Sequence, residues 1–223
     1  MIVRWGWMAL AAAAIVGCDR DPSPKDSGPP PAAPGGERGR VVFLGTSLTA
    51  GLGLDPSQAY PALLQRKIDS AGLEFEAVNA GVSGETSAGA RVRIDWLLRQ
   101  PAAVLVIETG ANDGLRGVDV DSMQANIQAI IDAARRQDPP PRIVLVGMRA
   151  LPNYGFSYAG RFRDVFPALA KQNGVVLVPF LLDGVAGRDA LNQADMIHPN
   201  ANGQARVAET VWPTLEKVLR GKS

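Results

Sequence analysis

Histidine and cysteine are nearly absent from this chain, since each occurs once among its 223 residues. A single cysteine, Cys18, cannot form a disulfide within the chain. A single histidine, His198, cannot build a multi-histidine metal site, and any reaction that needs an imidazole must use it. Asp195 lies three residues before His198 and could orient the ring by accepting the proton of one ring nitrogen. The alternative is an idle surface histidine beside an acid.

Long hydrophobic runs, excess charge and nucleotide motifs are also missing. The apolar stretch at residues 5–17 is shorter than the ~20 residues that a membrane-spanning helix needs. The 23 basic residues nearly balance the 22 acidic ones, and no basic stripe is present, so we predict no nucleic-acid partner. The glycine-containing segment 45–51 lacks the Walker lysine and does not spell G-x-G-x-x-G, so neither standard nucleotide motif is present.

Residues 1–18 have the layout of an export signal. One positive charge, Arg4, precedes a short apolar stretch that ends in small residues. The last four residues, Ile15-Val16-Gly17-Cys18, resemble the lipobox of bacterial lipoproteins, which implies that Cys18 is lipidated and begins the mature protein. We therefore expect an exported bacterial lipoprotein, anchored through Cys18 at the periplasmic side of a membrane. The alternative is an ordinary signal in which Cys18 is only a small apolar residue.

The composition changes twice after this signal. Residues 19–39 are rich in proline and glycine without a repeat, which predicts a semi-extended linker rather than a core. Residues 40–223 are then of the right size for one folded domain.

Apolar runs alternate with amphipathic stretches along this domain. Five runs have strand length, and four of them are near-continuous and rich in branched residues, as expected for strands covered on both faces. The less apolar run at 75–78 fits an edge strand. The predicted strands lie at 41–44, 75–78, 104–107, 143–146 and 175–178, and the predicted helices at 57–71, 86–100, 120–136, 159–173 and 201–219. This alternation predicts an α/β fold, a flavodoxin-like three-layer α/β/α sandwich around a five-stranded parallel sheet.

Polar loops follow the first three predicted strands, at the sheet rim where sites form in such folds. The first loop carries Ser47, the second Gly84 and the third Asn112. A glycine amide and an asparagine amide beside a serine hydroxyl are what an oxyanion site requires. Another interpretation is a phosphate cradle, because Thr46-Ser47-x-Thr49-x-Gly51 loosely resembles the phosphate loop of flavodoxins. A flavin site would also need aromatic side chains, and the nearest are Tyr154, Phe156 and Tyr158.

The whole pattern resembles the SGNH hydrolases, also called the GDSL esterase family, and in particular their bacterial thioesterase I/lysophospholipase-like and arylesterase branch. The likeness extends from Val41 to about Gly203 and includes the segments 60–64, 112–117 and 151–155. It implies that Ser47 is the nucleophile, Asp195 the acid and His198 the base. It also implies that the oxyanion hole consists of Ser47, Gly84 and Asn112, and that no metal or organic cofactor is required.

The same resemblance implies a serine hydrolase that cleaves carboxylic esters through an acyl-enzyme. We expect small-molecule ester or lipid substrates, among them aryl esters, short- to medium-chain acyl esters, thioesters and lysophospholipids. The loops at 151–158 and 181–194 either flank the acyl group or only pack against the core. One departure is Thr46, which replaces the usual aspartate of Gly-Asp-Ser. Two alternatives are a non-catalytic acyl- or glycan-binding lipoprotein on the same fold and a flavodoxin-like FMN carrier.

Overall fold

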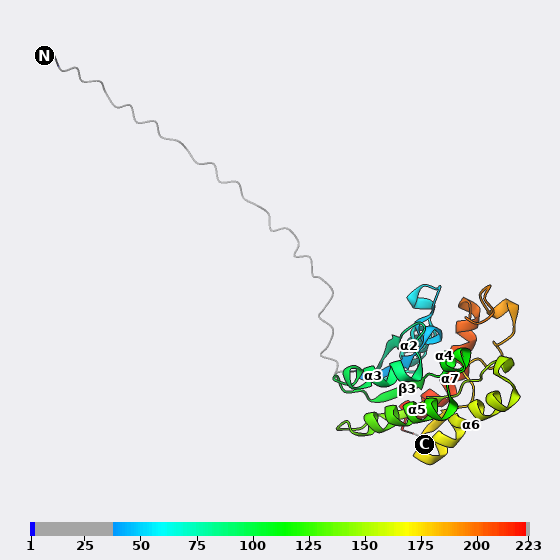
Figure 1. The fold of residues 1–223 in the computed structure, drawn as a ribbon. Helices are drawn as coiled ribbons and strands as arrows, with labels where there is room; N and C mark the ends of the chain where they lie inside the picture. The colour runs from blue at the N-terminus through cyan, green and yellow to red at the C-terminus, as the bar shows by residue number, and fades with distance from the viewer. Residues whose placement is uncertain (3–37, 222–223) are drawn as a thin grey trace. The chain divides into compact units, whose positions relative to one another are not determined.

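The computed structural model describes residues 1–2 and 38–221 of the chain (Figure 1). The predicted signal, the lipidation site at Cys18 and nearly all of the predicted linker therefore lie outside the described residues. The first strand begins at Gly39. Within the described part of the chain, no helix is both long enough and apolar enough to cross a membrane.

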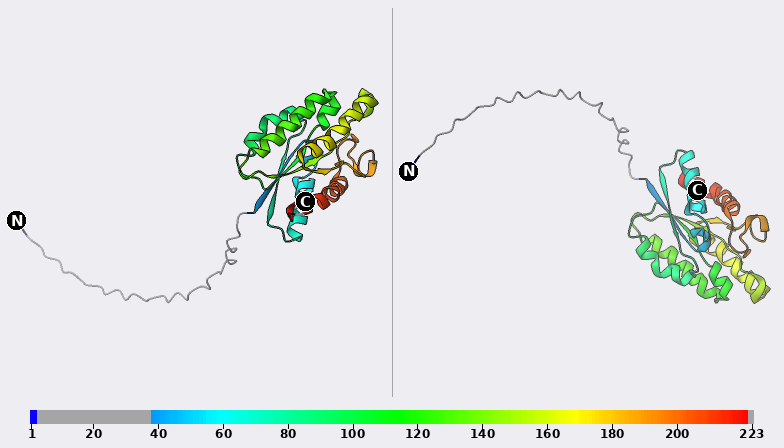
Figure 2. Two further views of the ribbon diagram at one scale, coloured as in Figure 1. Left: turned by 90° about the horizontal axis from the view of Figure 1, so that it is seen from below. Right: turned by 90° about the horizontal axis from the view of Figure 1, so that it is seen from above.

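Five parallel strands form a single sheet in the order β2-β1-β3-β4-β5. Helices cover both faces of the sheet, which confirms the predicted three-layer α/β/α sandwich (Figure 2). The strands are β1 (Gly39–Gly45), β2 (Phe75–Gly81), β3 (Val104–Glu108), β4 (Arg142–Val146) and β5 (Val176–Val178).

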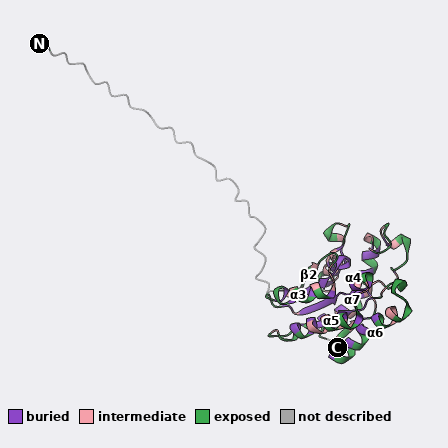
Figure 3. Ribbon diagram, viewed as in Figure 1, coloured by how far each residue is buried: buried purple, intermediate pink, exposed green. Residues whose placement is uncertain are grey.

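The three central strands are apolar because they are covered on both faces. All five residues of β3 are buried, as are the last four of β4 (Figure 3). β2 is an edge strand, as its mixed composition predicts. The expectation that the run at 175–178 is fully covered is wrong, because β5 is the other edge of the sheet. It has a partner on one side only, and Val176 is 37% exposed.

The helices form one layer on each face of the sheet (Figure 2). In α5 (Val120–Arg135) the side chains of Met123, Ile127, Ile130 and Ala134 recur at helical spacing, and all are buried. Burial of each large apolar side chain contributes about 1.5–3 kcal/mol, so this stripe attaches α5 firmly to the sheet. The first layer consists of α2 (Tyr60–Ser70) and α7 (Ala201–Leu219), and the second of α3 (Ser87–Leu97), α5 (Val120–Arg135) and α6 (Phe156–Asn173).

The strand order reverses at β1, and this places the site. The chain passes from β1 through α2 to β2 on one side, and then through α3 to β3 on the other side of β1. The loops beyond the carboxyl ends of β1, β2 and β3 therefore meet at a topological switch point, where open α/β sheets bind ligands. These are the three loops that carry Ser47, Gly84 and Asn112.

Helix boundaries differ from the prediction in a few places. The helix expected from residue 57 begins at Tyr60, because a separate 3-10 turn, η1 (Pro56–Gln58), precedes it. The helix expected from residue 159 begins at Phe156. Two short helices were not predicted, α1 (Ser47–Ala50) and α4 (Ala111–Arg116), since neither is long enough to show a periodic pattern.

Candidate active site

Ser47 is the first residue of α1, immediately beyond the carboxyl end of β1. The hydroxyl of Thr46 caps this helix and accepts the N–H of Leu48 at 3.5 Å. β2 approaches α1 so closely that a Cβ on Gly81 would lie 2.3 Å from the backbone nitrogen of Ala50. Only glycine fits at position 81, so β2 lies directly against the turn that carries Ser47.

His198 and Asp195 approach Ser47 from the loop before α7. The ring nitrogen Nε2 of His198 lies 2.9 Å from Oγ of Ser47, although the two residues are far apart in the sequence. The other ring nitrogen, Nδ1, lies 2.6 Å from Oδ2 of Asp195. The structure therefore brings the three residues that the sequence proposed for the triad into one continuous chain of contacts.

The turn from Asp195 to His198 has an unusual backbone. Met196 has a φ of 59°, in the left-handed region that non-glycine residues seldom adopt. Oδ1 of Asp195 stabilises the turn by accepting the backbone N–H groups of Ile197 and His198, each at 3.0 Å. The N–H of Gln193 closes the loop by donating to the carbonyl of His198 at 2.7 Å. A locally strained conformation persists when its surroundings hold it this firmly.

The charge of Asp195 determines what His198 can do. The backbone N–H of His198, its ring N–H and the N–H of Ile197 together lower the pKa of Asp195 to about 2. An ionised carboxylate only accepts hydrogen bonds, so Nδ1 of His198 must carry the proton that it donates to Asp195. In the neutral ring Nε2 is then unprotonated and accepts the hydroxyl proton of Ser47. This arrangement can remove a proton from the serine.

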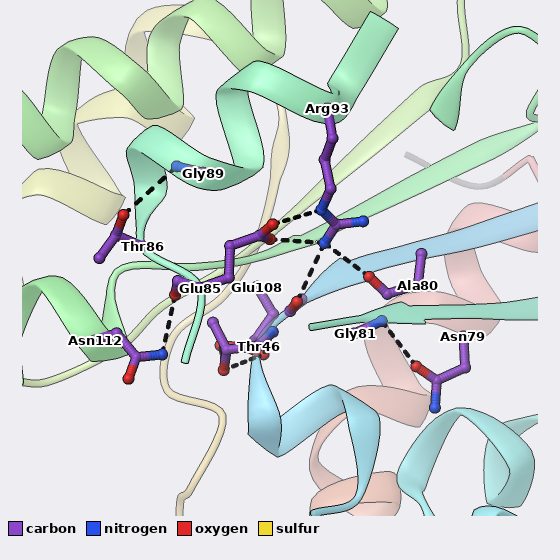
Figure 4. Close-up of polar contacts among 11 residues, drawn as sticks. Thr46, Asn79, Ala80, Gly81, Glu85, Thr86, Gly89, Arg93, Glu108 and Asn112 are labelled. Carbon is purple, nitrogen blue, oxygen red and sulfur yellow. Dashed lines mark hydrogen bonds and ion pairs between the residues drawn. The ribbon is translucent and has the colours of Figure 1, made fainter. Parts of the chain in front are cut away.

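Three N–H groups are candidates for an oxyanion hole. Ser47 opens α1, so helix geometry gives its N–H no partner within the helix. Gly84 has a φ of 79°, and its N–H has no backbone acceptor within the described residues. Asn112, in α4, donates through Nδ2 to the backbone carbonyl of Glu85 at 2.9 Å, which orients its amide (Figure 4). This hydrogen bond joins loop 82–86 to α4.

Glu108, the last residue of β3, is a buried carboxylate behind this turn that sequence reasoning did not single out. It accepts the N–H of Thr46 at 2.8 Å and the Thr46 hydroxyl at 3.0 Å (Figure 4). It also accepts the hydroxyl of Thr49 at 2.8 Å. Tyr60 in turn donates to the Thr49 hydroxyl at 2.8 Å. Burial raises the pKa of Glu108, and the hydrogen bonds from Thr46 and Thr49 oppose this shift. A sequence signal did exist, namely an acidic residue at the end of an apolar strand.

This network explains how Thr46 is accommodated. A threonine hydroxyl donates to the Glu108 carboxylate, whereas an ionised aspartate at position 46 would face it with a second negative charge. Thr46 therefore stabilises the turn through three contacts. Its backbone N–H and its hydroxyl donate to Glu108, and its hydroxyl oxygen caps α1 by accepting the N–H of Leu48.

The two loops expected near an acyl group differ in their burial. In the segment 181–194, Leu181 and Val185 are fully buried and belong to the core, so the packing interpretation holds for them. Tyr158 donates to the carbonyl of Val118 at 2.8 Å and thus covers the end of α4. Exposed apolar side chains nevertheless occur in several segments that follow the carboxyl ends of the strands: Leu52, Val82, Leu151, Tyr154, Met196 and Ile197.

Comparison with known proteins gives consistent matches to ester hydrolases. The model of the GDSL-like Lipase/Acylhydrolase family matches residues 43–206. Esterase TesA of Pseudomonas aeruginosa is 42% identical over 180 residues, which cover 80% of this chain and 89% of that protein. Arylesterase of Vibrio mimicus is 34% identical, with 81% of this chain and 90% of that protein covered. Thioesterase 1/protease 1/lysophospholipase L1 of Escherichia coli is 35% identical, with coverage of 82% and 86%.

The solved structures point the same way. A crystal structure of TesA superposes with a TM-score of 0.76 at 42% identity and covers 81% of this chain and 99% of that one. The arrangement of strands and helices is thus that of the SGNH hydrolases. These relatives are named as hydrolases. Of the three functions considered from the sequence, they favour an ester hydrolase over an FMN carrier or a non-catalytic binding protein.

Proposed function

Because this chain belongs to the GDSL-like lipase/acylhydrolase family and is an ester hydrolase, we propose that Ser47, His198 and Asp195 carry out its reaction. One observation carries this proposal, the unbroken line of contacts from Ser47 Oγ to His198 at 2.9 Å and from His198 to Asp195 at 2.6 Å.

In the proposed mechanism the reaction takes place in two symmetrical halves. His198 Nε2 accepts the proton of Ser47 as Oγ attacks the carbonyl carbon of the ester. The N–H groups of Ser47, Gly84 and Asn112 stabilise the oxyanion that forms. His198 then gives its proton to the departing alcohol, phenol or thiol, which leaves an acyl group on Ser47. In the second half, His198 Nε2 takes a proton from water as the water attacks the acyl carbonyl carbon. His198 then gives that proton to Ser47 Oγ, which releases the carboxylic acid and restores the serine hydroxyl.

Asp195 acts throughout as an ionised acceptor. It fixes Nδ1 as the protonated ring nitrogen and stabilises the imidazolium that forms when Nε2 takes the serine proton. Its low pKa follows from three hydrogen bonds that it accepts within its own turn. These three hydrogen bonds are therefore enough to keep the Asp195 carboxylate ionised.

The proposal is tested by the hydrolysis of p-nitrophenyl butyrate by Ser47→Ala and His198→Ala proteins. Both variants should fall to near background, because each removes a group that bonds or transfers a proton. Ser70→Ala, at the exposed last residue of α2, serves as the control and should keep wild-type activity. Full hydrolysis by purified Ser47→Ala protein would end the proposal.

The substrate class follows from the exposed apolar residues at the rim and from the activities for which the relatives are named. We propose aryl esters and short- to medium-chain acyl esters as substrates, with thioesters and lysophospholipids as further members of the class. A series of p-nitrophenyl esters from acetate to decanoate, run beside an acyl thioester and a lysophospholipid, gives the preference. Rates that fall steeply from acetate onward would contradict an apolar acyl site.

We also propose that the mature enzyme is a lipoprotein held at the periplasmic side of a membrane through Cys18. The support is the lipobox-like segment that ends at Cys18 and the proline-rich stretch after it. Such a tether restricts the enzyme to exported esters, so cytosolic acyl-CoA is not its physiological substrate.

A further inference from the structure

Two of the proposed oxyanion donors, the Gly84 N–H and the Asn112 amide, are both linked to Glu85. The N–H of Gly84 precedes it in the chain, and Asn112 donates to its backbone carbonyl at 2.9 Å. Gly84 itself is exposed and has a positive φ of 79°, so its own conformation does little to fix where its N–H points. Arg116 Nη2 also donates to the carbonyl of Gly84 at 3.0 Å, so Arg116 and whatever holds Glu85 together set the position of the two donors.

The Glu85 carboxylate is held by Arg93, which lies on α3. The guanidinium binds it in bidentate fashion, with Nε to Oε1 at 2.7 Å and Nη2 to Oε2 at 2.7 Å (Figure 4). The side chains are largely buried, with 18% of Arg93 and 9% of Glu85 exposed. A paired, partly desolvated fork of this kind is stronger and more directional than a surface ion pair.

The same guanidinium also reaches the sheet. Nη2 of Arg93 donates to the carbonyl of Ala80 in β2 at 2.8 Å and to the carbonyl of Gly45 at the end of β1 at 3.3 Å (Figure 4). Gly45 is two residues before Ser47. One side chain thus connects the loop of the oxyanion donors to the strand that carries the nucleophile.

We propose that Glu85 and Arg93 are positioning residues, which hold the Gly84 N–H and the Asn112 amide in register with Ser47. This inference rests on the proposed function, because it assigns the two residues to the oxyanion hole of that reaction. Neither touches the reacting atoms; they act through the loop backbone and through Asn112. Oxyanion donors help only when aimed at the charge that develops, and a 1 Å displacement can cost ~10²-fold in rate.

The test measures kcat and KM of Glu85→Gln and Arg93→Gln proteins with p-nitrophenyl butyrate. We expect kcat to fall about 10- to 100-fold while KM stays within about 3-fold, because the loss concerns the transition state. Arg161→Gln breaks an exposed pair with Asp121 at 2.8 Å and should leave both constants unchanged. Arg93→Lys, which keeps the charge but not the fork, should recover only part of the rate.

A double-mutant cycle separates positioning from mere support of the fold. When Asn112→Ala has already removed one donor, adding Arg93→Gln should cost clearly less in kcat than it does alone. If Arg93→Gln does not fold, Glu85→Gln carries the same cycle, since it keeps the side-chain shape and the backbone carbonyl.

Two outcomes would overturn the inference. One is a kcat within about 2-fold of wild type in folded Glu85→Gln protein, and the other is a cycle in which the two losses simply multiply. If Ser47→Ala is inactive in either case, the proposed reaction stands and only the positioning role fails. If Ser47→Ala is active, the reaction itself is wrong.

Discussion

Asp195→Asn is the substitution whose effect the geometry defines most sharply. It keeps the shape of the side chain but replaces one of its two acceptor oxygens with an NH2 donor. Oδ1 accepts two backbone N–H groups at 3.0 Å, from Ile197 and His198. The amide oxygen of the asparagine must occupy that position, because an NH2 group there would face two donors.

The NH2 group is then forced to the Oδ2 position, 2.6 Å from Nδ1 of His198. Nδ1 can only accept from it, so the ring proton moves to Nε2 and points at Ser47. The base in the variant is the wrong tautomer. In serine hydrolases this change lowers kcat by ~10⁴, which corresponds to about 5 kcal/mol of transition-state stabilisation.

The assay is the initial rate of p-nitrophenyl butyrate hydrolysis from about pH 4 to 9, with the unfolding midpoint measured in parallel. Because the pKa of Asp195 is about 2, the wild-type carboxylate stays ionised over this range and adds no acid limb to the profile. Asp195→Asn should remain folded and lose its activity at every pH. Activity within about 10-fold of wild type would refute the tautomer argument, since that tautomer change is expected to cost ~10⁴.

Four further changes have defined outcomes. Asn112→Ala should lower kcat ~10²–10³-fold without loss of fold, as measured by rates and circular dichroism, because it removes one oxyanion donor. Gly84→Ala should lower kcat while destabilising the protein by about 1–2 kcal/mol in urea, because its φ of 79° is unfavourable for alanine. Glu108→Gln should flatten the pH dependence of stability: burial raises the carboxyl pKa in the folded state, so wild-type stability declines as pH rises from about 4.3 through that raised pKa, and the variant lacks this decline. Cys18→Ala should abolish lipid attachment, which mass spectrometry of the mature N-terminus and sensitivity to globomycin would show.

The sheet could be predicted because its central strands are continuous apolar runs with polar loops after them. The candidate site could be predicted because Ser47 follows the first strand, His198 is the only imidazole, and the resemblance to the SGNH hydrolases implies their roles. The structure adds their contacts. It joins Ser47 to His198 at 2.9 Å, a pairing between opposite ends of the domain that no local pattern specifies.

The supporting residues were harder to foresee. Arg93 is one of two arginines on α3, and nothing in its spacing shows that its guanidinium turns toward Glu85 and two strand carbonyls. The helices α1 and α4 are too short for a periodic signal, and the sheet and their caps hold them instead. Buried polar networks depend on tertiary placement, which local sequence does not encode.

The most direct test of the proposed mechanism is labelling with an active-site fluorophosphonate, read by intact mass and by peptide mapping. The reagent should add once to wild-type protein, with the adduct on Ser47, and esterase activity should disappear in proportion to labelling. His198→Ala should react far more slowly, and Ser47→Ala should take up no label. An adduct on another residue, or full activity in fully labelled protein, would contradict the assignment of Ser47 as the nucleophile.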